Sequence, residues 1–410
     1  MTLTERFPAF ASRDFKLFWS AQFVSNIGTQ MQFVALNWQV YTLTHSAFAL
    51  GLIGFLRFVP ILIFSLVGGA VADAHNRKKL QFITQSIYII LSLTLAITDF
   101  TGKINVPIIY LITLFSAGTL AFDGPARQAF IPSLVEKKHL SNAISLNSIM
   151  FQTATIVGPS IAGILIAKTH LWTIYSLNAA SFIFVLASLI LIKSKGNVEG
   201  VPAQISLTSI VEGLSFVRKK TMIWSTMMLD FFSTFFSSAT ALIPIYAKDI
   251  LAVGPTGLGF LYSAPAIGAV IAGFLVAHKH NLRNQGMILL VSVGFYALGT
   301  VIFGLSHIFI LSILALIVVG AGDSVSTIIR NTIRNLETPD YIRGRMTSVN
   351  MIFFMGGPQL GDFEAGTLAG YMGAPFSVVT GGIATLVVVA AMAKKLPVLR
   401  KYDRHVSQII

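Results

Sequence analysis

The chain contains no cysteine and few charged residues, since Asp, Glu, Lys and Arg make up 11% of its 410 residues. The absence of cysteine excludes a disulfide-stapled secreted domain and any zinc or iron–sulfur site with thiolate ligands. A soluble domain carries about 25% charged residues. Because the chain is also 54% hydrophobic, its composition argues against a disordered protein and a soluble enzyme, and favours a polytopic membrane protein.

Sequence motifs of catalysis are absent as well. The chain has no Walker phosphate-binding loop, no HExxH and no GxSxG, and its eight histidines are mostly scattered at loops and ends. An enzyme within the membrane would need a nucleophile and a base placed together. The sequence therefore predicts a protein that is not an enzyme and holds no metal ion or cofactor.

Long apolar segments dominate the sequence instead. A helix that crosses a bilayer needs about 20 mostly apolar residues. Twelve such segments occur, at residues 17–41, 48–71, 80–99, 106–123, 143–167, 172–192, 222–247, 256–277, 286–305, 308–329, 346–371 and 375–393. The sequence thus predicts an all-α integral membrane protein with twelve transmembrane helices.

The basic residues test this prediction. The net charge of +13 would also suit a nucleic-acid binder. However, 25 of the 29 Lys and Arg residues fall in alternate loops and at the two ends of the chain, three fall in the other loops, and Arg57 falls within a span. This asymmetry is typical of a membrane protein with both termini in the cytoplasm. No nucleic-acid partner is expected, and the first apolar segment is too long for a cleaved signal peptide.

The two halves of the chain are similar to each other. A shift of 203 residues places Arg127 on Arg330, Asn147 on Asn350 and Gly158 on Gly361. One shift that aligns several polar and glycine positions favours duplication over chance likeness. We expect two pseudo-symmetric six-helix bundles, residues 1–192 and 222–410, joined by a linker at 193–221.

The linker has a helical apolar period at Leu207, Ile210, Val211, Leu214 and Val217, and it ends in basic residues. This pattern is typical of an amphipathic helix on the inner leaflet. An ordered linker without lipid contact explains it equally well.

Five segments carry a family resemblance. Residues 69–78 (GAVADAHNRK) resemble the signature loop of the major facilitator superfamily, although Ala74 replaces the usual arginine and Asn76 the usual glycine. Gly158, Pro159 and Gly163 resemble the Gly-Pro motif of its drug–proton antiporters. Residues 123–132, 142–147 and 357–366 are similar to the bacterial branch that contains the enterobactin exporter and related efflux proteins.

The resemblance and the residue positions imply a latch on the cytoplasmic side. Asp123 and Arg77 lie at the inner ends of neighbouring spans, so that a bridge between them is expected, with ordinary surface charge as the alternative. Gly158, Pro159 and Gly163 would permit close helix packing. The residues of the expected latch are Gly69, Asp73, Arg77, Lys78, Asp123 and Arg127.

Ionisable residues within spans are costly and usually mark a pathway or a coupling site. Five stand out here, namely Arg57, Asp230, Asp323, Asp362 and Glu364. Arg57 and Asp230 lie nine residues into their spans, about 14 Å deep. In the superfamily fold, Asp230 and Asp323 would face the central cavity, and they are the leading candidates for proton or cation coupling. Structural ion pairs between helices are the competing interpretation, and the superfamily's usual fourth-span arginine is missing.

The first span has an unusually polar stripe of amide side chains. Four recur at helical spacing and are candidates to line a substrate cavity, namely Gln22, Asn26, Gln30 and Asn37. Hydrogen bonding between helices is the alternative.

The sequence predicts a secondary active transporter of the bacterial inner membrane. The resemblance implies a proton-coupled exporter, an antiporter that moves a small amphipathic molecule such as a drug, siderophore or metabolite by alternating access. Expected partners are the substrate, a proton or other cation gradient and membrane lipid, and a monomer is expected. An importer of the same fold and a non-transporting receptor or scaffold are the alternatives.

Overall fold

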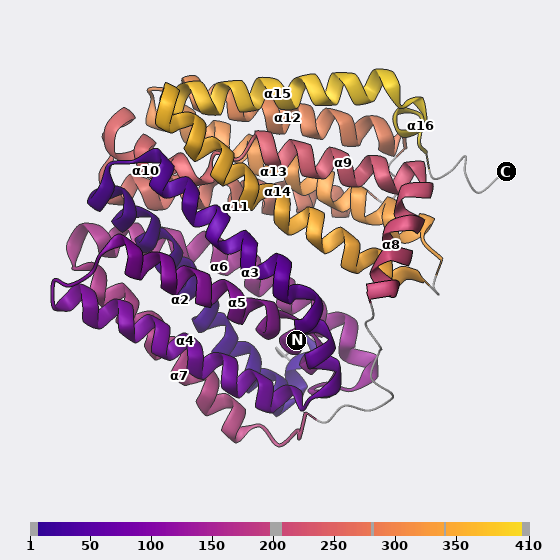
Figure 1. Cartoon of the computed structure of the whole chain (residues 1–410). Helices are drawn as coiled ribbons and strands as arrows, with labels where there is room; N and C mark the ends of the chain where they lie inside the picture. Colours follow the sequence, from indigo (N-terminus) through magenta and orange to yellow (C-terminus); the bar gives the residue numbers. More distant parts are fainter. Residues whose placement is uncertain (1–6, 197–206, 280–282, 340–341, 404–410) are drawn as a thin grey trace. The chain divides into compact units, whose positions relative to one another are not determined.

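The structure is a computed structural model that describes residues 7–196, 207–279, 283–339 and 342–403 (Figure 1). The all-α fold class is confirmed, and this described part contains twelve long helices. They are α2 (Arg13–Thr44), α3 (Ala47–Ala74), α4 (Arg77–Phe100), α5 (Val106–Phe130), α6 (Leu140–Lys168), α7 (Leu171–Leu191), α9 (Thr221–Phe236), α11 (Gly254–His278), α12 (Gln285–Leu305), α13 (Phe309–Glu337), α14 (Arg343–Met372) and α15 (Ala374–Lys395).

Shorter elements connect these helices. They are η1 (Pro8–Ala11), η2 (Ile131–Ser133), η3 (Lys137–His139), α8 (Leu207–Lys219), η4 (Thr240–Leu242), α10 (Ile243–Ile245), η5 (Tyr246–Ile250) and α16 (Pro397–Arg400). Local sequence signals fix several helix starts. The Asn76 side chain accepts a hydrogen bond from the Lys79 N–H at the start of α4, and Asn105 accepts one from Ile108 at the start of α5.

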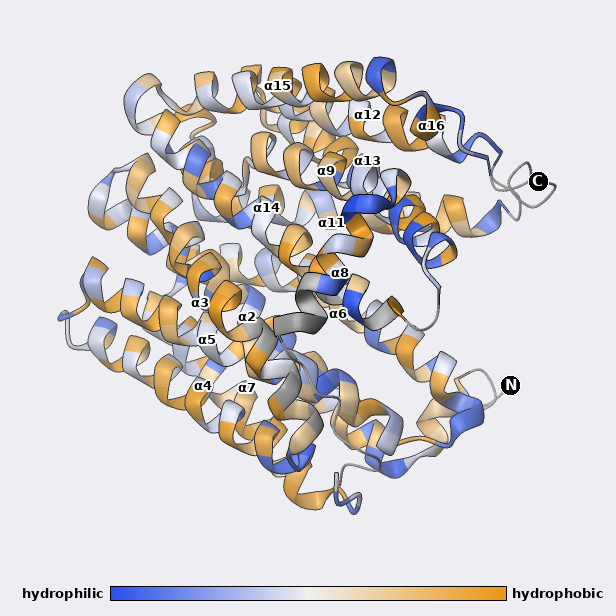
Figure 2. Ribbon diagram, turned by 45° about the vertical axis from the view of Figure 1, so that its right-hand side comes forward, coloured by the Kyte–Doolittle hydropathy of each residue, from blue (hydrophilic) through white to orange (hydrophobic). Residues whose placement is uncertain are grey.

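Ten stretches of the described helices are long and apolar enough to cross a membrane, as judged by length and composition. Figure 2 shows apolar residues along most of the long helices. The other two long helices, α2 and α14, carry polar side chains and glycines within their spans. Burial within the protein accounts for part of that polarity, since Gln22, Asn37 and Gln39 of α2 are at most 3% exposed.

The chain divides into two compact units. Unit 1 comprises residues 1–44 and 59–205, and unit 2 comprises 45–58 and 206–410. The boundary inside α3 falls just before Pro60, a residue that lacks the N–H needed to continue the helical hydrogen bonding. The expected bundles at 1–192 and 222–410 stay a prediction, and residues 45–58 are where the observed units differ from them.

Glycines explain why the first half of α3 packs in unit 2. A Cβ on Gly51 would stand 2.8 Å from the Gly366 Cα, and a Cβ on Gly54 would stand 2.5 Å from the Gln359 carbonyl oxygen. Only residues without a side chain allow α3 and α14 to approach this closely.

A close approach of this kind occurs at equivalent positions in the two units, as the internal repeat predicts. A Cβ on Gly158 of α6 would lie 2.5 Å from Gln30 Cβ of α2. A Cβ on Gly361 of α14 would lie 2.4 Å from the Phe235 carbonyl oxygen of α9. The aligned glycines therefore serve one packing role, in which the fifth span of each half contacts the first.

Helix α8 is bound to unit 2. Val217 is fully buried and packs with Ile223, Met227 and Met346, while Glu212 forms an ion pair with Arg345. These contacts support the ordered-linker interpretation for this end of the helix. Residues 207–211 carry most of the expected lipid-facing stripe, and the structure does not describe their side chains.

Candidate functional site

Three charged side chains meet in the interior of unit 2. One Asp230 oxygen lies 2.9 Å from an Arg330 nitrogen, and the other lies 3.2 Å from an Arg334 nitrogen. All three residues are at most 2% exposed. Asp230 therefore joins α9 to α13 through one carboxylate shared by two guanidinium groups, an arrangement that stabilises charge where water is excluded.

Hydrogen bonds complete the surroundings of the arginines. Arg334 donates to the Thr226 hydroxyl at 3.2 Å, to the Thr226 carbonyl at 2.9 Å and to the Asn350 side chain. Arg330 donates to the Thr327 hydroxyl at 2.9 Å. The two guanidinium groups are therefore fixed by α9, α13 and α14 together.

Asp323 extends this cluster towards a cavity. Its carboxylate lies 3.6 Å from Arg330, and its side chain is 48% exposed while that of Arg330 is 2% exposed. Two carboxylates thus balance two guanidinium groups in formal charge. Asp323 is the member of this charge cluster (Asp230, Asp323, Arg330 and Arg334) that a solute or a proton can reach.

The positions of the arginines differ from those expected from the sequence. The sequence places Arg330 and Arg334 just after the span at 308–329, among the basic residues of the cytoplasmic loops, but both lie in α13, which continues to Glu337, and both are buried. The excess of basic residues in the predicted cytoplasmic loops remains when these two arginines are left out of the count. Asp323, Thr327, Arg330 and Arg334 follow one another at spacings of four, three and four, which places them on one helix face. That period could have identified the cluster.

The internal repeat does not reproduce the charge cluster. The shift of 203 residues places Ile27, Leu120 and Ile131 at the positions of Asp230, Asp323 and Arg334. The two halves therefore share helix packing, whereas this ionisable cluster belongs to the second half.

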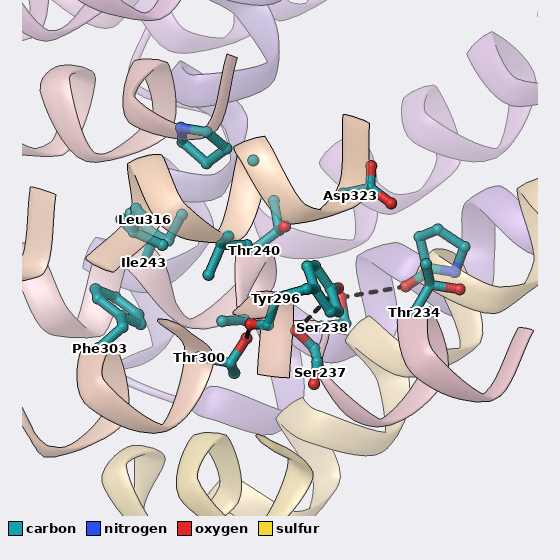
Figure 3. A pocket seen from close by; sticks show the side chains of 15 residues that line it. Thr234, Ser237, Ser238, Thr240, Ile243, Tyr296, Thr300, Phe303, Leu316 and Asp323 are labelled. Carbon is teal, nitrogen blue, oxygen red and sulfur yellow. Dashed lines mark hydrogen bonds between the residues drawn. The ribbon is translucent and has the colours of Figure 1, made fainter. Parts of the chain in front are cut away.

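A cavity of about 200 Å³ lies within unit 2 next to Asp323. Figure 3 shows Asp323 and Thr234 towards one end and Ile243, Phe303 and Leu316 towards the other. Between them lie hydroxyl-bearing side chains from the segment after α9, from η4 and from α12, namely Ser237, Ser238, Thr240, Tyr296 and Thr300. The cavity is polar at one end and apolar at the other.

The seventh span is broken where it lines this cavity. The sequence predicts a span at 222–247, and in the structure the helix is interrupted within it, since α9 ends at Phe236 and η4 begins at Thr240.

 The stretch Thr221–Ile250 as a whole is nevertheless long and apolar enough to cross a membrane. Pro244 has no N–H to donate to the Thr240 carbonyl, which accepts a hydrogen bond from the Tyr262 hydroxyl at 3.2 Å instead.

Asp362 of α14 stabilises the break. One of its oxygens accepts hydrogen bonds from the Ser238 hydroxyl at 2.5 Å and from the Ala241 N–H at 3.2 Å. The Tyr296 hydroxyl donates to the Ser237 carbonyl at 3.4 Å. Backbone groups freed by a broken helix need such partners inside a membrane. This role matches the structural alternative for Asp362, and Arg57 interacts electrostatically with the same carboxylate.

Asp362→Ala is expected to lower the thermal stability of the protein. The Ala241 N–H and the Ser238 hydroxyl would lose their acceptor, and an unsatisfied buried donor costs about 1–3 kcal/mol. The unfolding midpoint of the purified protein, followed by tryptophan fluorescence, measures the effect. Glu364→Ala is the matched control, because Glu364 lies on the same helix and makes no hydrogen bond or ion pair with the described residues. Equal midpoints for the two variants would contradict the proposed role of Asp362.

The described contacts of the expected latch residues lie within unit 1. Arg77 donates to the Ala129 carbonyl at 2.9 Å, and Lys78 donates to the Ile192 carbonyl at 2.7 Å. Gly69 and Asp73 lie in the last turns of α3, and the side chain of Asp73 is outside the described side chains. Arg127 lies in the last turn of α5. A latch between the two halves stays a prediction.

The expected Asp123–Arg77 bridge is absent from the described side chains. Asp123 is 3% exposed and accepts hydrogen bonds from Thr84 at 2.8 Å and Gln85 at 2.9 Å. These two residues follow Arg77 by seven and eight positions on α4, which is about 10–12 Å along the helix. Asp123 therefore lies too deep in unit 1 to meet Arg77.

The four cavity candidates of α2 have differing surroundings. Gln22 and Asn37 are 2% and 3% exposed. Asn37 and Asn26 donate to carbonyls of their own helix, whereas Gln30 donates to the Thr155 hydroxyl of α6 at 3.2 Å. Bonding between helices accounts for Gln30, and the lining of a substrate cavity by these four residues stays a prediction.

Neighbouring amides of the same stripe bind other helices. The Gln39 side chain donates to Asp99 of α4 at 2.5 Å and accepts from the Tyr175 hydroxyl of α7 at 2.6 Å. Asn178 of α7 donates to Gln32 at 2.8 Å. Part of the polar stripe therefore joins α2, α4 and α7 inside unit 1.

The fold defines the class of the protein. A solved structure of a bacterial homologue of the human lysosomal transporter Spinster, inward-facing and unoccupied, matches with a TM-score of 0.73. The match covers 94% of this chain and 98% of that chain at 14% identity, and it therefore concerns the fold alone. The chain is a multi-pass membrane protein with the major facilitator fold.

The family follows from the sequence comparison. Residues 4–409 match the family described as transmembrane secretion effector, and the chain belongs to this family. The staphyloferrin A transporter of Staphylococcus aureus is 25% identical over 343 residues, which cover 82% of this chain and 85% of that protein. The enterobactin exporter EntS of Escherichia coli is 26% identical over 398 residues, which cover 96% of this chain and 94% of that protein.

Proposed function

We propose that the chain is a secondary active exporter that moves a small amphipathic molecule across the bacterial inner membrane in exchange for protons. The observation that carries the proposal is the buried charge cluster of unit 2, which reaches a cavity through Asp323. Ionisable groups are kept inside a membrane bundle at a cost, and in transporters they serve proton and substrate exchange. Family membership and the relatives named as the enterobactin exporter EntS and the staphyloferrin A transporter support the same function.

Asp323 is the proposed site of proton exchange. The charged groups around it are Arg330, Asp230 and Arg334, and the Tyr296 hydroxyl faces it from α12. Protonation of Asp323 would remove its attraction for Arg330 and leave Arg330 with Asp230 alone. Asp230 is enclosed by two guanidinium groups and is the less accessible of the two carboxylates. We therefore assign proton exchange to Asp323 and a structural role to Asp230.

Transport would proceed by alternating access of two six-helix bundles, residues 1–192 and 222–410, with the linker at 193–221 between them. Both termini would lie in the cytoplasm, as the distribution of basic residues indicates. The protein would work as a monomer in contact with membrane lipid.

Purified protein in liposomes with an imposed pH gradient tests the function. Enterobactin, staphyloferrin A, tetraphenylphosphonium and benzylammonium would be added in turn, and a pH-sensitive dye would report proton movement. We expect at least one compound to dissipate the gradient through the protein and not through protein-free liposomes. Accumulation of that compound against its gradient, with protons moving the opposite way, distinguishes export by antiport from import. No response to any compound would favour a non-transporting receptor.

A further inference from the structure

Most of the hydroxyl groups that line the cavity of unit 2 already donate a hydrogen bond to another group of the protein. Thr234 donates to the Asp230 carbonyl at 2.8 Å, Ser237 donates to Thr385 at 2.7 Å, and Ser238 donates to Asp362 at 2.5 Å. A hydroxyl group has a single proton and two acceptor lone pairs. These three groups can therefore only accept hydrogen bonds from a molecule in the cavity.

The α12 side of the cavity has the same property. Thr300 donates to the Tyr296 carbonyl at 3.0 Å, and the Tyr296 hydroxyl donates to the Ser237 carbonyl at 3.4 Å. Pro265 and Pro358, which also line the cavity, have no N–H. Among the described lining residues, the Thr240 hydroxyl is the one side-chain donor that makes no hydrogen bond within the protein.

The charge that faces the cavity is negative. The Asp323 side chain is 48% exposed, whereas those of Arg330 and Arg334 are 2% and 3% exposed and lie behind it. An anion at the Asp323 end of this cavity would meet a carboxylate and side-chain hydroxyl oxygens that accept hydrogen bonds. A cation with several N–H groups would find hydrogen-bond acceptors in Asp323 and in the hydroxyl oxygens near it.

We propose that this cavity binds a protonated primary amine attached to a compact apolar group. The ammonium group would lie at the Asp323 end and donate to Asp323 and the hydroxyl oxygens, and the apolar group would lie against Ile243, Phe303 and Leu316 (Figure 3). A volume of about 200 Å³ limits the ligand to roughly one ring. The inference rests on the proposed function, because it names the substrate class of the same site.

Proton and amine would compete for one carboxylate. A protonated Asp323 offers no charge to the ammonium group, so that binding of the amine would release the proton. The affinity for the amine should accordingly rise with pH as Asp323 ionises. This competition would link the amine to the proton exchange without a second ionisable site.

Binding of benzylammonium and of benzoate to the full-length protein in lipid nanodiscs tests the inference. Isothermal titration calorimetry should detect benzylammonium, with tighter binding at pH 8 than at pH 6, and no benzoate. Asp323→Asn should weaken benzylammonium binding about tenfold or more and remove its pH dependence. Thr300→Val, which removes one acceptor, should weaken it about threefold. Thr94→Val, an exposed position on α4, is the matched control and should bind as the unchanged protein does.

The outcomes separate this inference from the proposed function. Benzoate binding as tightly as benzylammonium, or unchanged benzylammonium binding by both Asp323→Asn and Thr300→Val, would overturn the amine site. Proton-coupled flux of another compound together with absent benzylammonium binding would overturn the amine site alone. Benzylammonium binding that depends on Asp323, with no flux of any compound, would support the site and refute the transport function.

Discussion

Asp230→Asn is expected to destabilise the protein strongly and to abolish transport driven by a pH gradient. Arg334 would keep its hydrogen bonds to Thr226 and Asn350 but lose its carboxylate, while Arg330 would keep Asp323. Removing one partner of a buried ion pair costs about 3–5 kcal/mol, because the other charge stays in a place that water cannot reach. The unfolding midpoint in detergent and flux in liposomes measure the two effects. The apolar spans should still direct insertion into the membrane.

The double variant Asp230→Asn with Arg334→Gln provides the control. It removes the guanidinium group that the first substitution leaves without a carboxylate, and part of the lost stability should return. A double-mutant cycle with Arg334→Gln alone gives the coupling energy between the two residues. Additive effects, or full proton-coupled flux in Asp230→Asn, would refute the role assigned to this ion pair.

Asp323→Asn is expected to separate proton movement from substrate movement. The variant cannot exchange a proton at this position, so flux driven by a pH gradient should fall about tenfold or more, as expected when a group with a role in proton transfer is removed. Exchange of labelled for unlabelled substrate without a gradient should continue at substrate concentrations high enough to offset the weaker binding, and it should lose its dependence on pH. Asp323 is half-exposed and makes one ion pair at 3.6 Å, so that the effect on stability should be small compared with that of Asp230→Asn.

Glu136→Gln is the control for this experiment. Glu136 is an exposed carboxylate that pairs with Lys138 at 2.7 Å in η3, outside the spans. Its replacement should leave both gradient-driven flux and exchange unchanged. If Asp323→Asn retained pH-driven flux, proton exchange would have to occur elsewhere, and Glu364 would be the next carboxylate to replace.

The fold class followed from the sequence because the bilayer imposes simple lengths. Each span needs a long apolar segment, and twelve segments of that kind appeared at the positions of the long helices. The glycines of the repeat were equally readable, since Gly158 and Gly361 occupy equivalent contacts in the two halves. The end of α13 could not be read from the sequence. The apolar segment stops near residue 329, but the helix continues through Arg330 and Arg334 because unit 2 itself, and not lipid, surrounds them.

Contacts between residues distant in the chain were decided by the tertiary structure alone. Asp230 and Arg334 are 104 positions apart, and no local pattern pairs them. The break in the seventh span depends on Asp362, 124 positions after Ser238, and on the hydroxyls of Tyr262 and Tyr296. The sequence by itself determined which residues are costly in a membrane, through hydrophobicity and charge. Only packing determined which of them are neutralised by a partner and which, like Asp323, remain open to a solute.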